Sequence, residues 1–78
     1  MKPKVIEKGI VNLPMEVEGY GIIYFDGEEN CIFCCEKEKD YLEMLESIPE
    51  KDIVEAFTPD RPMTTRISVG VYCERREL

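Results

Sequence analysis

The sequence predicts a small α+β domain, in which one main helix packs on an antiparallel or mixed sheet of about four to five strands in the order β-β-β-α-β-β. Three patterns indicate this class. Residues 19–36 hold two apolar runs around a cluster of turn formers, residues 39–48 have helical periodicity, and residues 65–73 alternate strictly between apolar and polar. The 78 residues form a single domain, 1–78, since a chain of this length supports one small core.

The first strand is predicted from Val11 to Val17, where every second residue is apolar. Pro14 lacks a backbone N–H, so this strand should lie at a sheet edge or break at the proline. Gly19 and Gly21 then predict a bend, a bulge or a close approach of another group.

A β-hairpin follows, with residues 26–30 (DGEEN) as its loop. Both hairpin strands are apolar on both faces, which is typical of strands in the middle of a covered sheet. Because one helix covers only one face, we expect a homodimer that packs sheet against sheet, or another protein partner. The alternative is a second helix over residues 49–57.

The main helix is indicated by an apolar stripe that consists of Tyr41, Leu42, Leu45 and Ile48. Asp40 and Glu43 have the spacing of a capping box, and Pro49 should end the helix. Residues 49–57 fit either a helix that opens at Pro49 or a loop that feeds a strand from Ile53 to Phe57. We favour the strand, because the last strand then has an antiparallel neighbour close in sequence.

Charge and composition restrict the partners. The chain has 17 acidic and 10 basic residues, a formal net charge of -7, so direct binding to nucleic acid or to an anionic membrane is not expected. Charged residues interrupt the apolar run that a secretory leader needs, and no uncharged run approaches the roughly 20 residues of a membrane span. We therefore expect a cytoplasmic protein.

The first candidate for a metal or thiol site is the group of four cysteines: Cys31, Cys34, Cys35 and Cys73. Their number suits a zinc site, but on a strand Cys31 and Cys34 point to opposite faces, and Cys31 and Cys35 lie about 13 Å apart. We therefore predict no metal site and treat the cysteines mainly as small buried apolar residues. A disulfide between Cys73 and one of the other three is the alternative, if the last strand neighbours the hairpin.

A second candidate is a binding loop in which basic and hydroxyl side chains gather, with the residues Arg61, Thr64, Thr65 and Arg66. Such groups suit a carboxylate or a phosphate, although a turn whose arginines pair with local acids would have the same pattern.

Catalysis has little support, because the chain has no histidine and no glycine-rich phosphate loop. We expect no cofactor. The function predicted is a small acidic, non-enzymatic interaction or regulatory module that forms a homodimer through one face of its sheet. Two alternatives stay open: a cysteine-based metal or thiol protein, and an acidic inhibitor that imitates nucleic acid.

Overall fold

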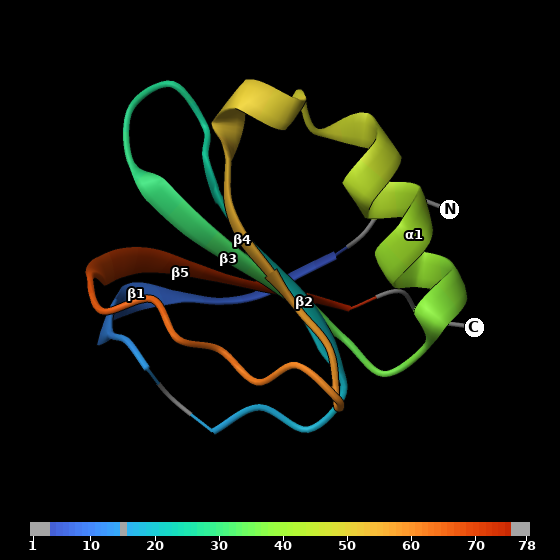
Figure 1. Cartoon of the computed structure of the whole chain (residues 1–78). Helices are drawn as coiled ribbons and strands as arrows, with labels where there is room; N and C mark the ends of the chain where they lie inside the picture. The colour runs from blue at the N-terminus through green and yellow to red at the C-terminus, as the bar shows by residue number, and fades with distance from the viewer. Residues whose placement is uncertain (1–3, 15, 76–78) are drawn as a thin grey trace.

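The computed structural model describes residues 4–14 and 16–75, with side chains for 10–14 and 16–70. It has one helix packed against a five-stranded mixed sheet, which confirms the predicted fold class (Figure 1). The elements are β1 (Lys4–Asn12), β2 (Tyr20–Phe25), β3 (Asn30–Cys35), α1 (Glu38–Ser47), a 3-10 helix (Glu50–Asp52), β4 (Ile53–Phe57) and β5 (Ser68–Arg75).

The sheet has the strand order β1-β5-β3-β2-β4. All neighbours are antiparallel except β3 and β5, which run parallel. The hairpin strands β2 and β3 therefore lie inside the sheet, as their two apolar faces predict. Strand β4 forms one edge, and β1 forms the other.

The first core lies between α1 and the sheet. Phe33 and Ile22 are almost fully buried there, together with Tyr41, Met44 and Leu45 of the helix and Ile48, the residue that follows its end. The last four positions follow the i, i+3, i+4, i+7 spacing of one helical face. Leu42, which the sequence placed in this stripe, is 48% exposed. Its predicted core position is wrong, because Met44 completes the stripe instead.

The second core lies on the opposite face of the sheet, and two loops of the same chain cover it. Figure 1 shows the segment between β1 and β2 and the segment between β4 and β5 on the side away from α1. Leu13 and Val17 from the first loop, and Met63 and Ile67 from the second, pack against Ile23, Ile32, Phe57 and Val69. Neither a second helix nor a second subunit is needed to cover these hairpin residues. The expectation of a dimer that rested on an uncovered hairpin face therefore does not apply to this part of the sheet.

The predicted capping box of α1 is wrong. The helix begins at Glu38, with Lys37 as the N-cap residue, and no side chain among the described residues caps it by a hydrogen bond. Asp40 therefore lies within the first turn, where its charge and that of Glu38 still suit the positive end of the helix dipole. The helix ends at Ser47, before Pro49, as predicted.

The bounds of β1 and the partners of β5 differ from the expectation. Strand β1 occupies Lys4–Asn12 and ends just before Pro14, whereas the alternation from Val11 to Val17 belongs mostly to the covering loop. Met15 lies outside the described residues. Strand β4 forms from Ile53 to Phe57 as predicted, but β5 pairs with β1 and β3 rather than with β4. The pairing of β5 with β1 joins residues far apart in the sequence, and the apolar-polar alternation within residues 65–73 does not specify it.

Gly21 makes room for a ring of the second core. A Cβ atom built on Gly21 would lie 2.1 Å from the ring of Phe57 and 2.7 Å from the backbone oxygen of Phe33. Gly19 has a φ of 106°, a left-handed conformation that favours glycine. The two glycines thus serve a close approach and a bend, two of the roles that the sequence predicted.

Candidate functional site

The loop between β4 and β5 is held to the sheet through Glu55 of β4. Its carboxylate accepts hydrogen bonds from the backbone N–H of Thr64 at 3.0 Å and of Thr65 at 2.8 Å. The hydroxyl groups of Thr64 and Thr65 also donate to it, at 2.9 and 2.6 Å. One side chain thus accepts four donors from two adjacent residues, and we call this arrangement the Glu55 clasp.

Electrostatics in the clasp favour the ionised carboxylate. Partial desolvation raises the pKa of Glu55, but the hydrogen bonds from the Thr65 side chain and from the backbone of Thr65 and Thr64 lower it more strongly, with a further contribution from the Thr64 hydroxyl. The result is a pKa of about 2, against an ordinary value of 4.5. The carboxylate is therefore charged at any pH near neutrality.

The Glu55 clasp involves two of the four residues of the predicted binding loop. Thr64 and Thr65 do bind a carboxylate, but it belongs to Glu55 of the same chain. Arg61 and Arg66 are both exposed, and the backbone of Arg61 closes a tight turn through reciprocal hydrogen bonds with Thr58 at 3.1 Å. The hydroxyl groups of the two threonines are therefore engaged by Glu55 and do not bind an external ligand together with the arginines. Anion binding by the two arginines stays a prediction.

The cysteines lie as a strand predicts. Cys35 packs in the core under α1, whereas Cys34 packs against the core under the loops, so their side chains lie on opposite faces of the sheet. Strands β3 and β5 pair at Cys31 with Gly70 and at Ile32 with Val71. Extended by two residues beyond Ile32 and Val71, this parallel register would align the backbone of Cys34 with that of Cys73. The side chain of Cys73 lies outside the described part of the chain.

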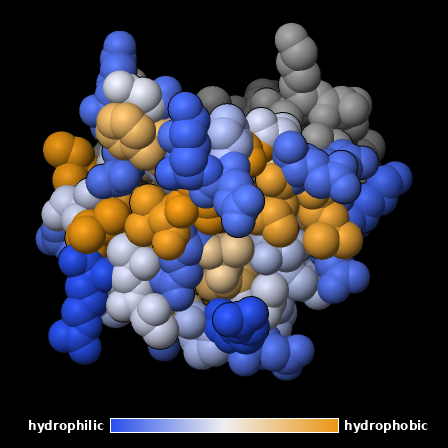
Figure 2. Space-filling view, turned by 45° about the horizontal axis from the view of Figure 1, so that its top comes forward, coloured by the Kyte–Doolittle hydropathy of each residue, from blue (hydrophilic) through white to orange (hydrophobic). Residues whose placement is uncertain are grey.

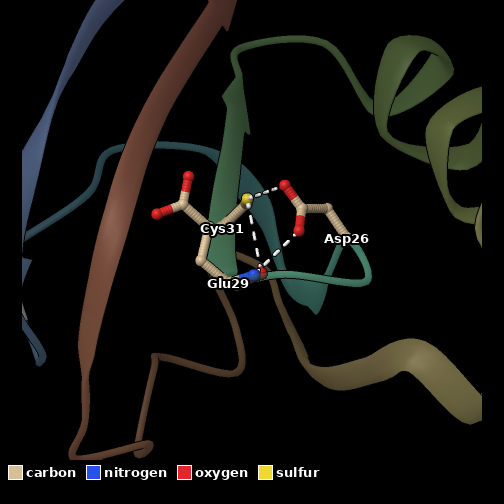
Figure 3. Close-up of side chains that lie close together, drawn as sticks. All are labelled: Asp26, Glu29 and Cys31. Carbon is tan, nitrogen blue, oxygen red and sulfur yellow. Dashed lines mark hydrogen bonds between the residues drawn. The ribbon is translucent and has the colours of Figure 1, made fainter.

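One polar cluster was missed by the sequence analysis. Asp26, Glu29 and Cys31 place one potential ligand atom each within 4.8 Å of one another (Figure 3). The Cys31 thiol lies 3.4 Å from Asp26 Oδ2, and the backbone N–H groups of Glu28 and Glu29 donate to Asp26 Oδ1 at 2.8 and 2.9 Å. These backbone hydrogen bonds lower the pKa of Asp26, and the bond from Glu29 has the largest effect. The D-x2-E-x-C spacing was visible, but only the hairpin turn brings its three groups together.

A pocket of about 420 Å³ opens between the two covering loops, and we call it the loop pocket. Its lining residues are Glu16, Val17, Glu18, Phe57, Thr58, Pro59, Pro62 and Met63. No single sequence pattern marks this site, because its two walls come from segments about 40 positions apart that meet only across the sheet face.

The fold and these sites define a small α+β domain with a pocket in its loop layer. No family model, no curated protein and no solved structure matches the chain. Among the described residues, no helix is long and apolar enough to cross a membrane.

Proposed function

We propose that this protein is a non-enzymatic interaction module, and that it forms a homodimer through the part of the sheet face that its loops leave open. The observation that carries the proposal is a pair of exposed apolar side chains, Phe25 at 40% and Val54 at 46%. They lie at the same end of two adjacent strands, β2 and β4. We call them the open patch.

The strand register brings the two residues to this end. Tyr24 pairs with Ile53 and Ile23 pairs with Glu55, so Val54 is an extra residue in a bulge of β4, and Phe25 is the last residue of β2. Alternation along β2 places Phe25 on the face that carries Ile23, beyond the area that the loops cover. In Figure 2, hydrophobic side chains form a band across the molecule between hydrophilic ones.

A second copy suits this patch because β4 is an edge strand. An edge strand presents unpaired backbone N–H and C=O groups, and a symmetry-related β4 offers the same groups in return. Burying the apolar side chains on dimerisation contributes up to about 1.5–3 kcal/mol for each one. The contact would thus extend from the open patch along the edge.

An interaction role is favoured over catalysis by the way the polar groups are used. Glu55 is engaged with Thr64 and Thr65, and Asp26 with its own turn. The net charge of -7 disfavours phosphate backbones and directs the proposal to protein surfaces. A cytoplasmic location, with the cysteines kept reduced, remains part of this proposal.

The oligomeric state in solution tests the proposal directly. Light scattering coupled to gel filtration should report a dimer for the wild-type protein and a monomer for the double variant Phe25→Ser, Val54→Lys. Leu42→Lys is the matched control, because Leu42 is as exposed but lies on α1, and this variant should remain dimeric. A monomeric wild-type protein, or a double variant that stays dimeric, would contradict the proposed dimer.

A cysteine-based metal protein is the second candidate, and the cluster of Asp26, Glu29 and Cys31 is the specific observation that favours it. Two carboxylates and a thiolate can bind zinc or cadmium. It ranks second because the Cys31 side chain is only 1% exposed and Asp26 already holds the turn. Cadmium titration should give thiolate absorbance that Cys31→Ser removes and Cys35→Ser retains, and a wild-type protein without this absorbance would exclude the candidate.

A further inference from the structure

The loop pocket combines an apolar interior with an acidic side. Val17 and Met63 are half-buried and pack against the second core, and Phe57 is almost fully buried within it. Glu16 and Glu18 stand on either side of Val17 in the sequence, and both are exposed. The volume of about 420 Å³ is in the range of sites that accept a small organic group.

The wall of the pocket formed by the loop between β4 and β5 is held in place by interactions within the chain. On one side, the turn from Thr58 to Arg61 is closed by two backbone hydrogen bonds at 3.1 Å, and Pro59 and Pro62 restrict the backbone there. Beyond Met63, the Glu55 clasp fixes the loop to β4. A ligand would therefore bind without first ordering this wall, which lowers the entropic cost of binding.

The charge of the pocket selects the ligand. Neither Lys nor Arg is among the lining residues, and neither Glu16 nor Glu18 makes a side-chain hydrogen bond or an ion pair with the described part of the chain. Their negative charges are therefore not neutralised by a described neighbour. A cation near the rim would be attracted, an anion would be repelled, and the apolar interior would accept an aliphatic stem.

We propose that the loop pocket binds the side chain of a lysine in a partner polypeptide, with its methylene groups against Val17 and Met63 and its ammonium group near Glu16 and Glu18. Lysine side chains place an aliphatic stem on apolar surface and keep the charged end near solvent, which is the arrangement that this pocket offers. The site does not include Phe25 or Val54, so it goes beyond the proposed homodimer and does not depend on it.

The test uses the whole protein, labelled with nitrogen-15, and follows its backbone amide signals. The probe is Nα-acetyl-lysine N-methylamide, and the uncharged comparison is the norleucine amide, which has a similar stem without the ammonium group. We expect the lysine probe to shift the amide signals of Val17, Thr58 and Met63. The norleucine probe should shift them several-fold less at equal concentration.

Matched variants separate local charge from net charge. Glu16→Gln with Glu18→Gln should weaken binding of the lysine probe about three- to tenfold, as expected for two solvent-exposed ion pairs. Glu46→Gln with Glu50→Gln makes the same change in net charge on α1 and the 3-10 helix, at residues that do not line the pocket, and should leave binding nearly unchanged. The amide spectrum of each variant also checks that the fold is retained.

The proposal would be overturned by no shifts at the pocket, by equal binding of the norleucine probe, or by equal weakening by the two double variants. Cadaverine distinguishes a free amine from a peptide side chain. Binding of cadaverine without binding of the lysine probe would also contradict the polypeptide source. None of these outcomes depends on the oligomeric state, so the pocket and the homodimer fail separately.

Discussion

Thr65 donates both its hydroxyl group and its backbone N–H to the carboxylate of Glu55, at 2.6 and 2.8 Å. The two residues are ten positions apart, and the contact joins strand β4 to the loop that covers its sheet face. Because the loop has no regular structure at this point, side-chain bonds replace the backbone pairs that a strand would use. The clasp is therefore a structural device of the loop layer.

Removing the clasp should destabilise the protein in a pH-dependent way. Glu55→Gln should lower the free energy of unfolding at neutral pH by about 1–3 kcal/mol, the scale of hydrogen bonds to a charged group. The folded pKa of Glu55, about 2, lies below the ordinary 4.5. Its contribution is thus fully present above about pH 4.5 and is lost as the pH falls through 2. Urea unfolding over this pH range measures the difference from wild type.

The control for the clasp is Glu46→Gln, an exposed substitution on α1 that should change stability by less than about 0.5 kcal/mol. Thr65→Val should reproduce part of the loss, and its effect should not add to that of Glu55→Gln. Additive effects, or a Glu55→Gln difference that stays constant down to pH 2, would contradict the clasp.

Gly21→Ala should destabilise the fold by steric overlap with Phe57, by about 1–3 kcal/mol. A second substitution, Phe57→Leu, removes the ring that the new methyl group would meet, so the double variant should lose less stability than the sum of the single losses. Thermal or urea unfolding of the three variants measures this coupling. Gly27 has no neighbouring atom within 4 Å of its built Cβ, so Gly27→Ala should show no such dependence on Phe57.

The exposed position of Leu42 on α1 predicts a contrast with Ile48, the residue that follows the helix. Leu42→Ala should cost less than about 0.5 kcal/mol, whereas Ile48→Ala, at a buried position, should cost about 2–5 kcal/mol. Equilibrium unfolding in urea measures both values. Equal losses would mean that Leu42 packs in the core, as the sequence pattern alone suggested.

Cysteine reactivity should follow the two faces of β3. In the native protein an alkylating reagent should modify half-buried Cys34 before Cys31 and Cys35, which are buried. Under mild oxidation, peptide mapping should find a disulfide between Cys34 and Cys73, because the register of β3 and β5, extended by two residues, would bring their backbones level. A disulfide from Cys73 to Cys31 or Cys35 would contradict this alignment.

The strand from Ile53 to Phe57 was predicted from an expected pairing with the last strand, but β4 pairs with β2 instead. Local sequence patterns predicted the hairpin and the main helix. Each depends on contacts that are near in sequence: turn residues between apolar runs, helical periodicity, and a proline that ends a helix. The opposite orientations of Cys34 and Cys35 also followed from the two-residue period of a strand. These features could be predicted because neighbouring residues alone determine them.

Candidate sites were less predictable. Thr64 and Thr65 were recognised as anion-binding groups, but the sequence did not show that Glu55 occupies them. The loop pocket was not predicted at all, because Glu16 and Pro62 lie far apart in the chain. Alternation from Val11 to Val17 even indicated a strand where the chain forms a covering loop, since Leu13 and Val17 face a core in both cases.

By itself, the sequence determined the class of fold, the negative charge and the two apolar faces of the hairpin. Only the tertiary structure decided how the second face is covered and which strands meet: two loops of the same chain cover it, and β5 lies between β1 and β3. The physical reason is that apolar burial is not directional, so a pattern shows that a residue must be covered but not by what. The covering group depends on long-range contacts that no local periodicity encodes.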